Sequence, residues 1–254
     1  MRHADWLVPE WQVPGVDALM TTRAGGVSLA PFDSLNLRAA VGDDPAAVAR
    51  NQRIVEQAMA ATPVYLNQVH GRRVVRLTAA DLLPDAAIHD ADASVTTEPG
   101  IACTAQVADC LPVLFAAPGG RAVGAAHAGW RGLALGVLEA TLHAVCEAAA
   151  CEPHEVSAWL GACIGPTRFE VGPDVLAAFD AAPDSPRFRA QGQGKWLADL
   201  GGLAVDRLQA AGVRDVSGGR WCTVSEASRF FSFRRDRVTG RMAAFVWIDR
   251  ERLC

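Results

Sequence analysis

Four short apolar segments between residues 93 and 126 constrain the fold more than any other part of the chain. The turns Glu98-Pro99-Gly100 and Pro118-Gly119-Gly120 separate them into pairs, so we expect strands at 93–97, 101–104, 111–116 and 122–126. Leucines and valines at helical intervals then predict a helix from Gly132 to Ala149. Because strands and helices do not alternate regularly, the pattern favours an α+β fold with mixed sheets over a doubly wound parallel sheet.

The flanking sequence predicts the remaining elements. A helix over 46–60 is expected to begin after Asp43 or Asp44, with Pro45 in its first turn. We also expect strands at 64–66, 74–77 and 156–160, helices at 173–180 and 199–211, and a closing hairpin formed by 230–233 and 242–248. With no internal repeat, the 254 residues are interpreted as a single domain, 1–254.

Composition excludes several classes of function. The formal net charge of −4 argues against a nucleic-acid-binding protein, which generally carries a basic face. Residues 1–11 hold Asp5, Pro9 and Glu10 and no apolar run of signal-peptide length. The most apolar stretch, 101–117, is interrupted by Gln106 and Asp109, so it predicts buried strands rather than a membrane span. Seven cysteines without a regular framework fit a reducing compartment, and we expect a cytoplasmic protein.

His70, Cys110 and His127 form the first candidate site. Catalytic zinc takes three protein ligands and leaves one position open, and two histidines with one cysteine meet that requirement. The spacing also permits two hydrogen-bonded loop histidines beside a buried thiol, or a cysteine nucleophile with a histidine base. An orienting carboxylate beside these residues is predicted to come from Asp109, Asp90 or Asp92.

Arginines supply the second candidate site. Arg23 lies in the glycine-rich turn 23–28, Arg131 stands at the start of a predicted helix, and Arg234 belongs to a run that also holds Arg229 and Arg235. A guanidinium group matches the oxygens of a phosphate, so we expect Arg23, Arg131 or Arg234 to bind an anion.

Three segments carry a resemblance to a known family: Asn67-Gln68-Val69-His70-Gly71, Ala108-Asp109-Cys110-Leu111-Pro112-Val113 and His127-Ala128-Gly129-Trp130-Arg131-Gly132. Further matches lie at 21–28, 35–37, 41–43, 164–166, 169–172, 222–223, 230–236 and 239–241. Together they resemble the YfiH-like or laccase-domain (polyphenol oxidase) family, now described as purine nucleoside phosphorylases, across essentially the whole chain.

The resemblance implies an α/β/β/α layered fold, shared distantly with a toxin deamidase, and a metal site at His70, Cys110 and His127. It implies zinc, with copper a less favoured alternative, and small-molecule partners: a purine nucleoside and phosphate. The implied activities are phosphorolysis of adenosine, inosine or methylthioadenosine, and adenosine deamination, which zinc could assist by activating water. A role in editing peptidoglycan precursors is also attached to the family.

The chain departs from the family pattern in two places. Thr167 and Arg168 replace residues that are cysteines in many relatives, and Arg38-Ala39-Ala40 follows Leu37 where a glycine and a histidine are common. The resemblance therefore assigns no role to these positions.

A zinc-dependent nucleoside enzyme is our first hypothesis, with Asp109 as a second-shell residue and a monomer or weak dimer as the expected state. The rivals are a metal-free cysteine hydrolase or amidase acting on cell-wall precursors, a copper-dependent phenol oxidase and a non-catalytic binding protein. Six histidines are too few for the several clusters of a multicopper oxidase.

Overall fold

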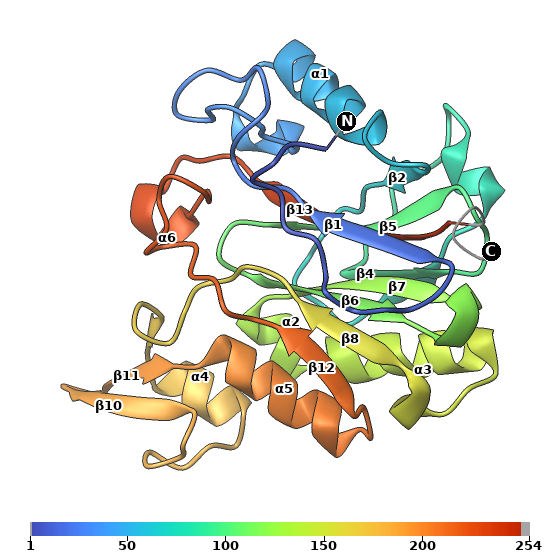
Figure 1. Ribbon diagram of the computed structural model, residues 1–254. Coiled ribbons are helices and arrows are strands. Elements are labelled where there is room, and N and C mark those ends of the chain that lie inside the picture. The colour runs from blue at the N-terminus through green and yellow to red at the C-terminus, as the bar shows by residue number, and fades with distance from the viewer. Residues whose placement is uncertain (1, 250–254) are drawn as a thin grey trace.

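Two mixed β-sheets packed face to face form the centre of the protein, whose computed structural model describes residues 2–249 (Figure 1). The first sheet has four strands in the order β1 (Val16–Met20), β13 (Met242–Ile248), β5 (Ile101–Val107) and β2 (Thr62–Val64). The second has six, in the order β12 (Asp215–Gly218), β8 (Ser157–Leu160), β6 (Leu111–Ala116), β7 (Val123–Ala128), β4 (Ala93–Thr96) and β3 (Val74–Arg76).

Both sheets combine parallel and antiparallel neighbours. The pairs β2/β5, β3/β4 and β12/β8 are parallel, and the other pairs in these two sheets are antiparallel. The predicted α+β class with mixed sheets is confirmed.

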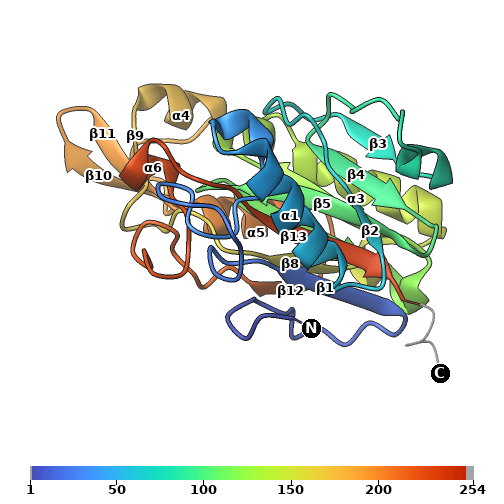
Figure 2. The same cartoon turned by 90° about the horizontal axis from the view of Figure 1, so that it is seen from above.

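Helices cover the outer face of each sheet. Helix α1 (Pro45–Glu56) lies over the four-stranded sheet, as the view from above shows (Figure 2). The opposite side carries α2 (Trp130–Ala134), α3 (Val137–Ala149), α4 (Pro173–Ala178) and α5 (Leu200–Ala210) (Figure 1). A small antiparallel sheet of β10 (Phe188–Gly192), β11 (Lys195–Ala198) and β9 (Glu170–Val171) flanks these helices, and α6 (Phe233–Asp236) precedes β13. The resulting order of layers is α/β/β/α.

The alternation of side chains along the strands explains why four layers stack. In β13, Phe245 and Trp247 pack with Val55 of α1, whereas their neighbour Val246 faces the second sheet and packs with Leu114 of β6 and with other residues of the inter-sheet core. β6 repeats the pattern, because Phe115 points to the opposite core, shared with the helices α3 to α5. Strands with two apolar faces therefore supply three separate hydrophobic cores.

Two predicted elements differ from the structure. Residues 230–233 do not form a hairpin with 242–248, since β13 pairs with β1 and β5, and Phe230 and Phe231 are buried in the loop before α6. The helix predicted over 132–149 is two helices, α2 and α3, separated at Gly136, which has a φ of 88°. Apolar content predicted the burial of both segments correctly but did not determine the strand partner or the break.

The apolar stretch 101–117 forms buried strands, as predicted, in β5 and β6. Within residues 2–249, we find no helix whose length and hydropathy would allow it to cross a membrane.

Asn51 of α1 joins the N-terminal loops to the fold, and its replacement by alanine should destabilise the protein. The fully buried side chain accepts from the Val27 amide and donates to Ser28 Oγ and to the carbonyls of Ser34 and Asn36. Asn51→Ala leaves these buried groups unpaired, so we expect the free energy of unfolding to fall by about 3 kcal/mol in urea denaturation. Arg50→Ala, an exposed change on the same helix, should have almost no effect; equal losses would contradict the prediction.

Candidate metal centre

The fold brings His70, Cys110 and His127 together at one end of the space between the two sheets. His70 lies in the loop between β2 and β3, and Cys110 lies in the turn from β5 to β6. His127 is the second-to-last residue of β7. Because β6 and β7 are paired with Pro112 opposite His127, the turn that holds Cys110 is directed toward His127. One ligand atom from each of the three residues lies within 4.8 Å of the others.

The three side chains differ in how far they are buried. His127 is buried, Cys110 is partly buried, and His70 is exposed. Cys110 Sγ lies 3.8 Å from His70 Nε2, and the two imidazole rings meet edge to face with centroids 4.8 Å apart. The group is thus buried at His127 and accessible to solvent at His70.

Asp92, just before β4, organises this group. Its carboxylate, only 1% exposed, accepts hydrogen bonds from the amides of Val69, His70 and Gly71 at 3.2, 2.9 and 2.6 Å. Oδ1 also lies 2.8 Å from Nδ1 of His127, which leaves Nε2 of that ring for other partners. Burial raises the pKa of Asp92, but the hydrogen bonds from His127, Gly71 and His70 outweigh it and hold the pKa below its usual value.

The electrostatics favour a thiolate at Cys110. Burial raises the pKa of this thiol, but the charge of His127 and hydrogen bonds from both histidines bring it well below its ordinary value. Burial lowers the pKa of His127, and the opposing effects of Cys110 and Asp92 raise it above its ordinary value. The thiolate is the form in which cysteine ligates a metal, and a metal ion would take the place of the His127 proton as its positive partner.

Backbone geometry shows that the loops are held in unusual conformations. His70 and Asp109 have φ values of 61° and 84°, in the left-handed region that non-glycine residues seldom adopt. The Asp109 carboxylate accepts from Thr223 Oγ1 at 2.5 Å and from the Arg234 amide at 2.6 Å. Those bonds tie the Cys110 turn to the C-terminal loops, while Asp92 contacts His127. That Asp109 supports a metal ligand stays a prediction.

The donor set and its surroundings fit a metal ion. Two imidazole nitrogens and one thiolate on one side of a solvent-accessible point are a ligand set typical of catalytic zinc. Gly129 leaves the space they need: a Cβ at this position would lie 2.8 Å from Cδ2 of His70 and 3.0 Å from Sγ of Cys110. Any larger residue would collide with these side chains. Steric exclusion therefore explains why position 129 of the motif 127–132 is a glycine.

Two cavities meet at this centre and share His70, Ala108, Cys110 and Phe233 as walls. The first, of about 260 Å³, is largely apolar and is completed by Trp130, Ile164, Phe169 and Leu200, with Asp109, Gly129, Arg131 and Arg234. The second, of about 380 Å³, is more polar than the first and is completed by Arg38, Ala40, Val41, Gln68, Gln106, His127 and Arg241. We call them the apolar and the polar cavity.

Only two of the three arginines predicted to bind an anion reach these cavities. Arg131 and Arg234 line the apolar cavity, where Arg131 lies over the Trp130 ring and Arg234 over Phe169. Arg23 is engaged elsewhere: it donates to the carbonyls of Asp33 and Ala227 and forms an ion pair with Asp33. The structure therefore does not bring Arg23 to the centre, because its glycine-rich turn packs against the loop before α6.

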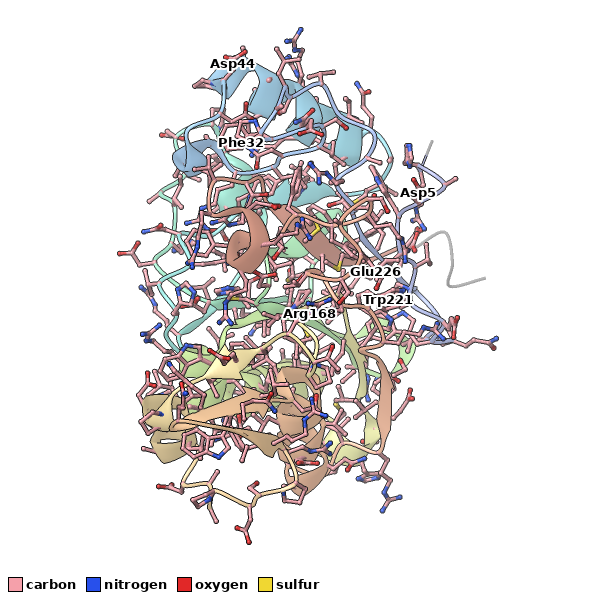
Figure 3. All side chains as sticks on the ribbon, turned by 90° about the vertical axis from the view of Figure 1, so that its left-hand side faces the viewer. Asp5, Phe32, Asp44, Arg168, Trp221 and Glu226 are labelled. Carbon is pink, nitrogen blue, oxygen red and sulfur yellow. The ribbon has the colours of Figure 1, made fainter. Side chains whose placement is uncertain are left out.

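Sequence reasoning missed Arg38 and Arg241, which line the polar cavity. No periodic pattern marks either residue, and their proximity follows only from the pairing of distant segments. Arg168, one of the positions that depart from the family pattern, lies on a side face near Trp221 and Glu226 (Figure 3), and it lines neither cavity. Its Nε donates to Ser225 Oγ at 3.4 Å.

Comparison with known sequences identifies relatives along the whole chain. Residues 17–249 match the family described as multi-copper polyphenol oxidoreductase laccase. A Pseudomonas aeruginosa protein named purine nucleoside phosphorylase is 48% identical over 248 residues, which cover 96% of this chain and 98% of the relative. YfiH of Escherichia coli, also named purine nucleoside phosphorylase, is 47% identical over 247 residues, covering 95% and 98%.

Solved structures share the fold. A Neisseria meningitidis protein of the DUF152 family superimposes with a TM-score of 0.90 at 48% identity, covering 96% of this chain and 99% of the other. YlmD from Geobacillus stearothermophilus superimposes with a TM-score of 0.85 at 34% identity, covering 93% of each chain.

Replacing Asp92 with asparagine should weaken metal binding without removing a ligand. Asparagine keeps the size of the side chain but loses the charge that holds His127 and the amides of 69–71. Loss of such an orienting partner lowers metal affinity by about 10- to 100-fold. When the protein is loaded with added zinc as a probe of the site, we expect Asp92→Asn to lose it to a competing chelator at correspondingly lower chelator concentrations. Asp90→Asn, an exposed carboxylate that bonds Asn67, is the matched control; equal zinc affinity in both variants would refute the role of Asp92.

Proposed function

Because this chain belongs to the multi-copper polyphenol oxidoreductase laccase family, we propose that it is a purine nucleoside phosphorylase with a zinc centre at His70, Cys110 and His127. The observation that carries the proposal is the position of these ligands between an apolar and a polar cavity. A phosphorolytic enzyme must hold a nucleoside and a phosphate on either side of the bond that breaks. The names of relatives at 47–48% identity support the same activity.

The presence of a single ligand group among the described residues is our reason to propose zinc rather than multicopper chemistry. Both histidines and the cysteine suit zinc, which needs no further ligand cluster. Within residues 2–249 these three residues form the one group of at least three that could hold a metal ion, so the multicopper chemistry in the family's description finds no second site there. When bound, zinc would act as a Lewis acid that polarises a substrate atom.

The apolar cavity is the proposed nucleoside site. Trp130, Phe169 and Phe233 line this cavity together with His70 and Cys110 and supply aromatic side chains for contact with a purine ring. Arg131 and Arg234 are positioned there to donate hydrogen bonds to polar groups of the base or the ribose. The cavity thus provides both the stacking and the donors that nucleoside binding needs.

In the proposed reaction, a phosphate oxygen bonds to C1′ of the ribose as the bond from C1′ to N9 breaks. The departing purine takes the electron pair and must be stabilised or protonated. Asp92 fixes the His127 proton at Nδ1 and thereby the orientation of the ring toward the centre. The structure's own contribution is to hold these groups in place while the cavities position both reactants.

Adenosine, inosine and methylthioadenosine are the proposed substrates, because all three present a purine base for the aromatic walls. Adenosine deamination is proposed as a second activity of the same centre. Deamination requires water instead of phosphate, so the two activities respond differently to added phosphate.

One observation favours a second candidate, a cysteine hydrolase or amidase. Without a metal, Cys110, His127 and Asp92 resemble the nucleophile, base and orienting carboxylate of a catalytic triad, and the pKa of Cys110 is lowered while that of His127 is raised. Such an enzyme would remain active after complete removal of metal. Sensitivity to chelation therefore separates the two functions.

Incubation with inosine or adenosine, with and without phosphate, tests the proposal. We expect free hypoxanthine or adenine with ribose 1-phosphate only when phosphate is present, and inosine from adenosine in either case. Chromatography of the products measures both reactions, and chelation should abolish them until zinc is restored. No turnover of any purine nucleoside by the zinc-loaded protein would end the proposal.

Cys110→Ala removes the only thiolate of the proposed centre. We expect it to lose zinc and at least a thousandfold of the phosphorolytic rate, since ligand and charge are lost together. Cys146→Ala, which changes a cysteine at the far end of α3, should keep both zinc and activity. Full activity in a metal-free Cys110→Ala protein would contradict the assignment.

A further inference from the structure

The polar cavity has the features of an anion site. It is lined by two guanidinium groups, those of Arg38 and Arg241, and by Gln68 and Gln106, and its wall includes His70, Cys110 and His127. No carboxylate residue is among its lining residues. Two guanidinium groups in a wall without a carboxylate favour a negatively charged ligand, because they outnumber the single negative charge that a Cys110 thiolate brings to the cavity.

Arg38 has its guanidinium free for a ligand. Its backbone is held, because the amide donates to Asn36 Oδ1 at 3.1 Å and the carbonyl accepts from Asn36 Nδ2 at 3.0 Å. Its side chain makes neither a hydrogen bond nor an ion pair with any part of the chain between residues 2 and 249. The five N–H donors of this group are thus available to the cavity.

Arg241 is held more tightly, and it too forms no ion pair with a carboxylate between residues 2 and 249. Nη1 donates to the carbonyls of Thr239 and Gly240, and the guanidinium lies 5.8 Å from the Phe233 ring centroid. Burial and the nearby charge of Arg38 lower the pKa of Arg241, and the charges of Cys110 and Asp109 only partly offset this effect. Two like charges that line one partly buried cavity destabilise each other, and a bound anion would relieve that repulsion.

A buried side chain fixes the two arginines relative to one another. Asn36, fully buried, accepts through Oδ1 from the amides of both Arg38 and Arg241, and Leu37 donates its amide to the Arg241 carbonyl. One asparagine therefore sets the separation of two residues that lie 203 positions apart in the sequence. The shared partner places both backbones beside the polar cavity, which both side chains line.

The structure assigns Arg38 and Arg241 as the groups that bind the phosphate oxyanion, in the polar cavity beside the metal ligands. The inference rests on the proposed phosphorolysis and divides the centre between its reactants, with inorganic phosphate on the Arg38 and Arg241 side. Arg131 and Arg234 remain on the nucleoside side, since Arg234 is engaged by the Glu170 carbonyl and both lie against aromatic rings of the apolar cavity.

Equilibrium dialysis of the zinc-loaded protein with radiolabelled inorganic phosphate tests the assignment without turnover. We expect Arg38→Ala and Arg241→Ala each to weaken phosphate binding at least tenfold with zinc content unchanged, and Arg241→Lys to recover part of the loss. Arg50→Ala removes one exposed positive charge from α1 and should bind phosphate like the parent protein. Arg38→Ala alters a partly exposed side chain, so it remains informative if Arg241→Ala fails to fold.

Steady-state kinetics separates this assignment from the proposed function. We expect both alanine variants to raise the KM for phosphate at least tenfold and to leave the KM for inosine nearly unchanged. Phosphorolysis with an unchanged phosphate KM in Arg38→Ala and Arg241→Ala would overturn the assignment and leave the function standing. Phosphate binding that depends on both arginines, without phosphorolysis, would support the assignment and overturn the proposed function.

Inosine 5′-monophosphate distinguishes the source of the phosphate group. We expect inorganic phosphate to bind when the nucleotide is absent. Tight binding of the nucleotide with no binding of inorganic phosphate would overturn the assignment, because the arginines would then recognise a phosphate monoester.

Discussion

The carboxylate of Asp92 is the interaction on which the candidate centre depends. A buried carboxylate is strongly unfavourable unless its charge is compensated, and here three amides of the loop 69–71 and the His127 ring supply the compensation. Satisfying Asp92 therefore places the His70 loop beside β7 and directs the His127 ring. The same requirement stabilises the left-handed backbone of His70, which would be unfavourable in isolation.

The layered fold explains why the centre has two sides. Strands β5, β6 and β7 are buried on both faces, so their apolar residues fill the cores and leave the polar ligands to the turns and strand ends. Ligands from three such positions close one end of the inter-sheet space. The loops around η1 (Ala39–Val41) and α6 contribute to the walls of two adjoining cavities, one of which is more polar than the other. A reaction between an aromatic nucleoside and an anion suits that division.

Apolar patterning predicted the strands and helices that build the hydrophobic cores, because their side chains repeat with the period of the element that buries them. It did not predict the sheet β9–β11, whose exposed residues carry little pattern, or the pairing of β13 with β1. Phe230 and Phe231 show the limit well. Their apolar content predicts a strand, but a loop can bury two phenylalanine side chains equally well, and that is what the structure shows.

The sequence by itself determined the mixed α+β class and identified His70, Cys110 and His127 as candidate ligands. Both depend on side-chain type and on short motifs, which can be recognised in consecutive residues. Only the tertiary structure selected Asp92 from three candidate carboxylates, separated Arg23 from the centre and joined Arg38 to Arg241. These choices depend on which distant segments share a hydrogen-bonding partner, such as Asn36 for the two arginines. No local pattern encodes that proximity, since it arises when strands from both ends of the chain pair in one sheet.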